Sequence, residues 1–314
     1  MVLPAVVAKQ RFRFYDGGDP GDPNGVGAEP ADPTIDVAVV LDRKLRTDED
    51  GRTREEFLLR RRIGYDDRHC GEIIVPPRYE SFSTDLTSVP ALFTWLVPKT
   101  GAHLPAALLH DGLVWDPAKE SKTYISTAGR EIDRVEADRI FRDGMADTGT
   151  ALVRRWLVWT AVTLATMWSR DGTSERALVR NYYRWIVPAT LIALGWLGYV
   201  ATADLFDRSA RWWLTYDLPW MGEGAFAWEL LTGVAGAVVI PLAVGVLWGK
   251  FRRAGWIAGI GVAVLFHVTI ALLAVTGLYA ALEWVTGKLS TAWLGLMALA
   301  LAATAVVLFV AGFR

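Results

Sequence analysis

The chain contains two hydrophobic patterns, and the change between them falls near residue 185. Before that point, short apolar runs alternate with charged residues at the spacing of strands and amphipathic helices, and after it the apolar runs are long and almost free of charge. This pattern predicts a soluble domain over residues 35–168 and a transmembrane domain over residues 185–314. Residues 169–184 form a basic connector, and residues 1–34, rich in Gly, Pro and Asp, are predicted to be a flexible leader.

The soluble domain begins with strands and continues with helices. Its Val- and Ile-rich segments predict a small antiparallel sheet, and its longer segments have helical periodicity. The fold class is therefore α+β. The predicted strands are Ile35–Leu41, Glu56–Ile63 and Glu72–Val75; the predicted helices are Val89–Val97, Leu104–Trp115, Glu131–Asp147 and the closing helix Ala151–Trp168.

Two of these helices carry polar residues on apolar stripes. His110 shares a face with Ala106 and Leu113, and Asp138 lies three residues from both Val135 and Phe141. A buried imidazole and a buried carboxylate each need a partner, so we expect His110 and Asp138 to bond to each other. An aspartate on one ring nitrogen fixes the tautomer and frees the other nitrogen to act as a base or ligand. The alternative is a pair that only locks two helices together, and both interpretations remain open.

Other charged residues near this pair have separate predictions. Asp111 points about 100 degrees away from His110 around the helix, toward the edge of a site for a cation or substrate. Asp85 either caps a turn in the segment Ser81–Pro90 or provides another carboxylate to the site. Asp111 and Asp85 are therefore candidate metal ligands. The charges around Asp138, Arg139 among them, are expected on the solvated side of their helix.

Composition narrows the class of protein. The net charge of −1 gives no basic excess that would indicate nucleic-acid binding. The single cysteine, Cys70, excludes an internal disulfide and is consistent with a reducing compartment. The apolar run Val2–Ala8 is too short for a convincing signal peptide.

The second half has four runs long enough to cross a bilayer, which takes roughly 20 residues each. Cations precede the first run and fill the loop between the second and third, so the positive-inside rule puts the soluble domain and the C-terminus in the cytoplasm. The lipid bilayer of the inner (plasma) membrane is thus the predicted partner. His267 lies in the third run, where a neutral side chain bonded to a neighbouring helix is expected. The runs are Trp185–Phe206, Phe226–Gly249, Trp256–Val285 and Thr291–Phe313.

Three short motifs resemble a known family. TDLTSVP (Thr84 to Pro90), AALLHDGL (Ala106 to Leu113) and R(x)7ADRIF (Arg130 to Phe141) occur in the order and spacing of domain-of-unknown-function family 1353 of phages and bacteria. The resemblance covers about residues 35–168. The family name implies a domain boundary and no reaction.

A His-Asp on one helix, followed by Ala-Asp(x)2-Phe on the next, also resembles the two-helix core of the phospholipase A2 group. That resemblance implies that His110 activates water, Asp138 orients it, and Asp111 binds calcium that polarises an ester carbonyl. Val114 stands where that group commonly has tyrosine, and its Gly-rich calcium loop and supporting cysteines are missing here.

Two functions follow from these observations. One is a membrane-anchored protein whose cytoplasmic domain hydrolyses a lipid-like ester with a His-Asp dyad and a divalent cation such as calcium. The other is a phage-derived, membrane-tethered binding or structural module whose His-Asp pair is buried and does no chemistry.

Overall fold

A computed structural model describes most of the chain. The predictions for Asp85, for the helix Val89–Val97 and for the fourth run Thr291–Phe313 fall outside the described residues. The described residues are 12–22, 25–47, 53–79, 82–84, 86, 100–114, 122–169, 177–205, 218–221 and 225–286.

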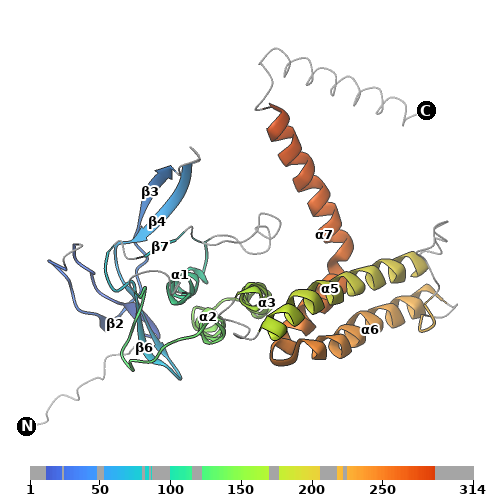
Figure 1. Ribbon diagram of the computed structural model, residues 1–314, viewed down its shortest axis with the longest axis horizontal. Helices are drawn as coiled ribbons and strands as arrows, with labels where there is room; N and C mark the ends of the chain where they lie inside the picture. Colours follow the sequence, from blue (N-terminus) through green and yellow to red (C-terminus); the bar gives the residue numbers. More distant parts are fainter. Residues whose placement is uncertain are drawn as a thin grey trace, which may run out of the picture. The chain divides into compact units, whose positions relative to one another are not determined.

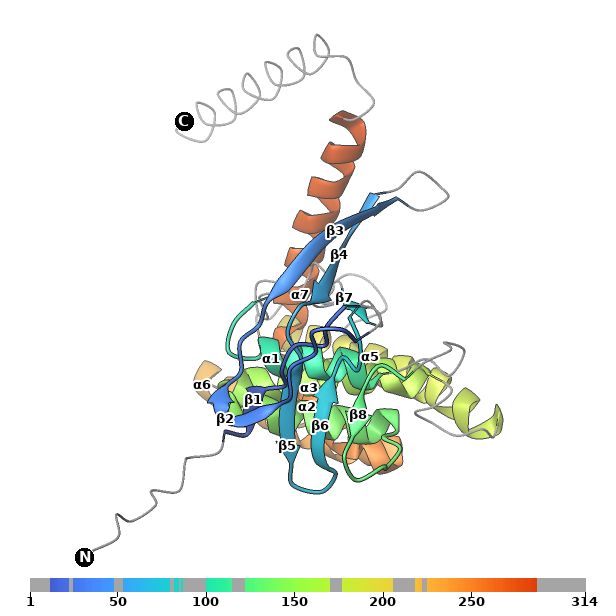
Figure 2. The same cartoon turned by 90° about the vertical axis from the view of Figure 1, so that its left-hand side faces the viewer.

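The first part of the chain forms two small antiparallel sheets, which confirms the α+β class (Figures 1 and 2). One sheet has the strand order β2-β1-β5-β6-β8, and the other has the order β3-β4-β7. The strands of the first are β1 (Phe14–Asp16), β2 (Asp32–Asp36), β5 (Ile63–Asp67), β6 (Gly71–Val75) and β8 (Ile125–Ser126); those of the second are β3 (Leu41–Thr47), β4 (Thr53–Leu59) and β7 (Ser83–Thr84).

The predicted flexible leader is wrong for residues 14–16 and 32–34, which belong to β1 and β2. Strand β1 lies between β2 and β5, and the side chains of Phe14 and Tyr15 are buried there. Asp16 is buried as well and accepts hydrogen bonds from the guanidinium of Arg61 on the neighbouring segment. Two aromatic side chains and one partly buried ion pair therefore fix this short strand within a Gly-rich region.

Two of the predicted strands, Ile35–Leu41 and Glu56–Ile63, are each interrupted by residues that belong to no strand. Residues 37–40 separate β2 from β3, and residues 60–62 separate β4 from β5. The second break occurs where Arg60 donates to Asp42 at 2.6 Å and Arg61 turns toward Asp16. These arginines pair with carboxylates on different strands, so the chain leaves one sheet and enters the other. The prediction of a strand at Glu72–Val75 is confirmed by β6.

Three helices follow one another away from the five-stranded sheet (Figure 1). The first, α1 (Leu104–Leu113), packs on β5 and β6, α2 (Arg134–Asp147) packs on α1, and α3 (Leu152–Trp168) packs on α2. The second begins later than predicted because Asp133 is its N-cap, accepting a 2.7 Å hydrogen bond from the Glu136 N–H. The three of the four predicted helices that fall within the described residues are present, and they enclose one apolar core with the sheet.

Close packing at two glycines brings α1 against its neighbours. A Cβ at Gly112 would lie 2.3 Å from Cγ1 of Val75 on β6, and a Cβ at Gly144 would lie 3.3 Å from that of Ala106. Gly112 therefore lets α1 approach the sheet, and Gly144 lets α2 approach α1. This packing sets the separation at which a side chain of α1 meets one of α2.

The second part of the chain is helical. Two apolar stretches, not the predicted four, are found among the described residues to be long enough to cross a membrane, and they are residues 177–205 and 226–265. The first helix starts inside the predicted connector, at residue 177. The elements are α5 (Ala177–Leu205), α6 (Phe226–Gly245), the short helix η2 (Val246–Phe251) and α7 (Arg252–Thr286).

The longer stretch contains a reversal of the chain. Gly249 has φ 55° and ψ −118°, a conformation that favours glycine, and the start of α7 then returns along α6. A Cβ at Gly245 would lie 2.5 Å from Trp256, and one at Gly259 would lie 2.9 Å from both Pro241 and Leu194. Small residues thus allow α5, α6 and the start of α7 to pack closely. The chain divides into units after Val264, and the second unit holds the rest of α7.

Candidate functional site

The predicted contact between His110 and Asp138 is present. His110 comes from the last turns of α1 and Asp138 from the middle of α2, and Nε2 of the histidine lies 2.9 Å from Oδ1 of the aspartate. Both residues lie on the faces that the two helices turn toward the common core. Each of the two polar residues occupies a position in an apolar stripe of its helix. The sequence pattern was therefore sufficient to predict their contact.

The pair is enclosed by apolar and aromatic groups. The ring of Phe141, one turn after Asp138 on α2, stacks on the imidazole with 4.8 Å between ring centroids and an interplanar angle of 27°. Oδ2 of Asp138 is buried and has no hydrogen-bond partner among the described residues. The carboxylate thus depends on His110 for its described hydrogen bond, and the imidazole is held in one orientation.

Asp111 extends the array in the other direction. Nδ1 of His110 lies 4.0 Å from Oδ1 of Asp111, and the Thr84 hydroxyl donates a 2.7 Å hydrogen bond to Oδ2 of the same carboxylate. Thr84 Oγ1 in turn accepts a 3.0 Å hydrogen bond from the Leu86 N–H. Sequence reasoning missed Thr84, because nothing in the pattern of a two-residue strand indicates contact with a helix.

The array runs from the interior to the surface. The side chain of Asp138 is 3% exposed, that of His110 is 12% exposed and that of Asp111 is 32% exposed. The carboxylate that orients the imidazole is therefore buried, while the carboxylate beside the opposite ring nitrogen is reached by water.

The described residues do not by themselves form the predicted calcium site. Calcium takes about six to eight oxygen ligands, and no group of three or more His, Cys, Asp or Glu side chains among the described residues is placed to hold a metal ion. Asp111 is the predicted ligand that the structure describes, and Asp85 lies outside the described residues. The divalent cation therefore stays a prediction.

Arg139 does not lie on a solvated face as predicted. Its guanidinium donates to Asp67 at 2.8 Å and to Glu136 at 2.9 Å, and Glu136 also accepts from the thiol of Cys70 at 3.3 Å. Burial raises the pKa of Asp67, but the hydrogen bonds from Arg139 and from the backbone N–H groups of His69 and Cys70 outweigh it and lower that pKa. This ion-pair cluster fastens α2 to the β5–β6 turn and so supports the helix that carries Asp138.

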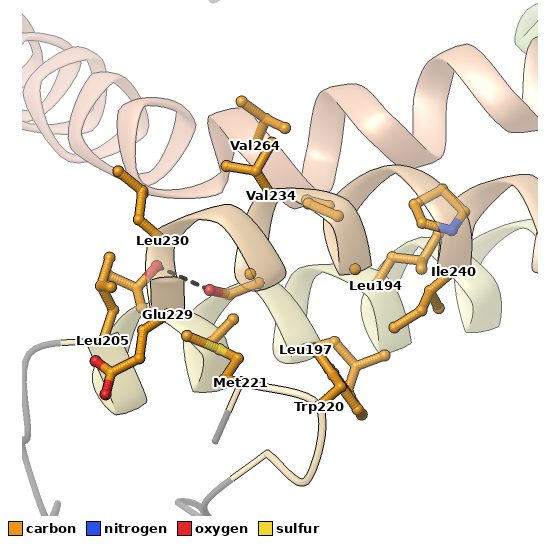
Figure 3. A pocket seen from close by; sticks show the side chains of 18 residues that line it. Leu194, Leu197, Leu205, Trp220, Met221, Glu229, Leu230, Val234, Ile240 and Val264 are labelled. Carbon is orange, nitrogen blue, oxygen red and sulfur yellow. Dashed lines mark hydrogen bonds between the residues drawn. The ribbon is translucent and has the colours of Figure 1, made fainter. Parts of the chain in front are cut away.

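Two cavities lie away from the His110 array. One of about 210 Å³ lies among α5, α6, the start of α7 and the segment around Trp220 (Figure 3). Its lining is largely apolar, and Glu229 contributes a carboxylate. The other, of about 340 Å³, is lined by Asp19, Arg60 and Tyr79 and their neighbours. His110, Asp111 and Asp138 line neither of these cavities.

The described fold and site define a class: an α+β domain with a His–Asp pair between two helices, joined to apolar helices. Residues 57–162 match the family model described as "Protein of unknown function (DUF1353)". The match supports the resemblance predicted from the three motifs, over a segment that begins within β4 and includes α1 and α2. Comparison with curated proteins and with solved structures gives no match.

Proposed function

We propose that the DUF1353 domain is a membrane-anchored hydrolase of lipid-like esters, with His110 as the base and Asp138 as the residue that orients it. The observation that carries the proposal is the exposure gradient from Asp138 through His110 to Asp111. A pair that served stability alone would need no partly exposed carboxylate beside its second ring nitrogen.

The proposed chemistry uses the two ring nitrogens for different tasks. Asp138 accepts a hydrogen bond from Nε2–H, which leaves the lone pair of Nδ1 on the side of Asp111. A water bound at Nδ1 gives its proton to the imidazole as its oxygen attacks the ester carbonyl. The imidazolium, stabilised by the buried carboxylate of Asp138, then gives that proton to the leaving alcohol as the ester C–O bond breaks.

A divalent cation near Asp111 and Asp85 remains part of the proposal as a separate element. It would polarise the ester carbonyl when bound. Rates measured with added calcium and with a chelator test it independently of the dyad. A rate that is unchanged by chelation removes the cation from the proposal and leaves His110 and Asp138 in place.

The membrane part of the proposal is a four-span anchor in the inner membrane, with the soluble domain and the C-terminus in the cytoplasm. Two apolar helical stretches support it, and the exposed apolar side chains of α5 and α6, such as Trp185 and Leu231, fit a lipid environment. Met167 of α3 packs with Tyr183 and Trp248, which joins the domain to the helices. The proposed substrate is lipid-like because this contact holds the domain beside the proposed bilayer.

Hydrolysis by the purified full-length protein tests the proposed reaction. The substrates are phospholipid vesicles and soluble carboxylic esters, and the variants are His110→Ala and, as a control, His69→Ala, which changes an exposed histidine in the β5–β6 turn. We expect turnover by the wild type and the control and its loss in His110→Ala. Full turnover by folded His110→Ala contradicts the proposal.

One observation favours the alternative of a non-catalytic binding or structural module. The described cavities leave out His110, and its side chain is largely covered. That alternative predicts a stability loss in His110→Ala with no turnover by any variant, the wild type included. The same assay therefore separates the two functions.

Labelling of single cysteines tests the proposed orientation. In a Cys70→Ser background, Arg253→Cys lies in the loop predicted to be cytoplasmic and Glu223→Cys in the loop predicted to be outside. An impermeant maleimide applied to intact cells should label Glu223→Cys and spare Arg253→Cys. The reverse pattern contradicts the orientation.

A further inference from the structure

The start of α5 and the turn between α6 and α7 lie side by side. The hydroxyl of Tyr182 donates to the carbonyl of Leu247 at 2.7 Å, and that of Tyr183 donates to the carbonyl of Trp248 at 3.4 Å. The ring of Tyr183 also meets that of Phe251, with 5.4 Å between centroids. Two segments far apart in the sequence thus form one fixed surface at this end of the helices.

This surface is basic. Its cations come from the first turns of α5, from η2 and from the start of α7, and all are exposed except one half-buried arginine. We name this set the basic patch, and its members are Arg180, Arg184, Lys250, Arg252 and Arg253. Residues 177–203 and 230–282 contain no Asp or Glu. The parts of α5, η2 and α7 that carry the patch therefore have no Asp or Glu, and α3, which packs on α5, has none either.

Several cations in the first part of the chain, by contrast, are paired with carboxylates. In the soluble domain Arg68 pairs with Asp147 at 2.6 Å, and Arg139 pairs with Asp67 at 2.8 Å. None of the ion pairs found among the described residues includes Arg180, Arg184, Arg252 or Arg253. Like charges gathered on one surface repel one another, so a bound anion would stabilise the patch.

The neighbours of the basic patch indicate what kind of anion this is. Tyr182 is 46% exposed and Trp185 is 78% exposed, and the guanidinium of Arg252 lies over the ring of Trp256 at 5.9 Å. Exposed Val246 and Leu247 continue the apolar surface from the turn into α6. Tyr and Trp between a cationic rim and an apolar surface are typical of the headgroup level of a bilayer. A soluble polyanion would match the charges and leave these apolar side chains in water.

We propose that the basic patch binds the phosphate headgroups of anionic phospholipids in the cytoplasmic leaflet. The occupant is a lipid such as phosphatidylglycerol, whose phosphate meets Lys250, Arg252 and Arg253 while its acyl chains lie along α5 and α6. The inference rests on the proposed insertion of these helices in a membrane. Because the same turn packs on α3, bound lipid stabilises the junction between the membrane helices and the DUF1353 domain.

The test uses the full-length protein in nanodiscs of phosphatidylcholine alone or mixed with phosphatidylglycerol. One variant combines Lys250→Gln, Arg252→Gln and Arg253→Gln. The matched control combines Arg43→Gln, Lys44→Gln and Arg46→Gln, which removes the same charge from β3 in the soluble domain. The readouts are the thermal midpoint and the phosphatidylglycerol that stays bound on extraction into neutral detergent, measured by native mass spectrometry.

We expect phosphatidylglycerol to raise the midpoint of the wild type and the control and to copurify with both. In the patch variant, loss of three charges should weaken retention on the order of a hundredfold, from about fivefold for each Lys or Arg near anionic headgroups. Equal retention by the patch variant and the control overturns the inference. An equal rise of the midpoint with inorganic phosphate in detergent, or with a soluble polyanion such as heparin, overturns it as well.

The outcomes also separate this inference from the proposed function. A protein that enters both kinds of nanodisc and shows no preference for phosphatidylglycerol contradicts the lipid site alone. A protein that enters neither contradicts the membrane anchor and the lipid site together.

Discussion

The imidazole of His110 joins α1 to α2 through its 2.9 Å contact with the carboxylate of Asp138. Both helices bury their facing surfaces, so this polar contact is surrounded by apolar groups, with Phe141 stacked on the imidazole. In such surroundings, removing either member of the pair leaves the other buried without its hydrogen bond, which lowers the stability of the fold.

Replacing His110 therefore has a predicted effect on stability, whatever the reaction. His110→Ala leaves Asp138 buried without its described partner and opens a space beside Phe141, so the free energy of unfolding should fall by about 1–3 kcal/mol. Chemical denaturation of the full-length protein in detergent measures the change. The exposed control His69→Ala should stay within about 0.5 kcal/mol of the wild type. Equal stability of the two variants would show that the contact between His110 and Asp138 contributes nothing to the free energy of unfolding.

The hydroxyl of Thr84 is predicted to hold Asp111 in place. Thr84→Val keeps the shape of the side chain and removes both the donor to Asp111 and the acceptor for the Leu86 N–H. Because Thr84 is buried, the loss should lower the free energy of unfolding by about 1–3 kcal/mol. Thr127→Val, at an exposed threonine bonded to the Glu72 carbonyl, is the matched control. A smaller effect at Thr84 than at Thr127 would contradict this role.

The close approach of α1 to the sheet predicts a clash at Gly112. In Gly112→Ala the new methyl group meets Cγ1 of Val75 at 2.3 Å, so α1 must shift at a cost of about 1–3 kcal/mol. The double variant Gly112→Ala with Val75→Ala removes the clashing group, and the two substitutions should then destabilise the protein less than the sum of the single changes. Strict additivity in denaturation experiments would contradict the predicted contact.

Acid should weaken the contact between the sheet and the end of α2. Burial raises the pKa of Asp147, but hydrogen bonds from Arg68 at 2.6 and 2.8 Å and from Tyr65 at 2.9 Å outweigh it and lower that pKa. A carboxyl whose pKa is lower in the folded state contributes stability above its unfolded pKa of about 3.9, and loses it as the pH falls through the folded value.

The variant Arg68→Gln removes the main cause of that lowering. Its stability should fall below that of the wild type at neutral pH, and the difference should shrink as the pH falls below about 4. Thermal unfolding measured across this range provides the test. Arg43→Gln, from an exposed pair with Glu55, is the control and should show little effect at any pH. If the stability difference between Arg68→Gln and the wild type stays constant with pH, ionisation of Asp147 is not its cause.

The helical part of the site could be predicted from the sequence because its signals are periodic. His110 and Asp138 each interrupt an apolar stripe, and a polar residue on such a stripe must find a partner on the facing helix. The boundaries of α1 and α3 follow from the same periodicity. The α+β class followed from the short Val- and Ile-rich runs that precede these helices.

The strands and the surface of the site could not be predicted in the same way. Strand β1 has only three residues, and its position depends on distant partners such as Arg61 and Tyr65. The contact from Thr84 to Asp111 joins positions 27 residues apart through a strand too short to show alternation. Arg139 was misplaced because its partner Asp67 lies on a strand hairpin that helical periodicity does not reveal.

The rate of ester hydrolysis, divided by the folded fraction of each protein, tests the central claim most directly. The comparison is among wild type, His110→Ala and Asp138→Asn, with His69→Ala as the control. If His110 is the base and Asp138 its orienter, both site variants should lose a factor of about 10²–10⁴ while the control keeps the wild-type rate. Full turnover by folded His110→Ala, or no turnover by the wild type with any of the esters, would contradict the claim.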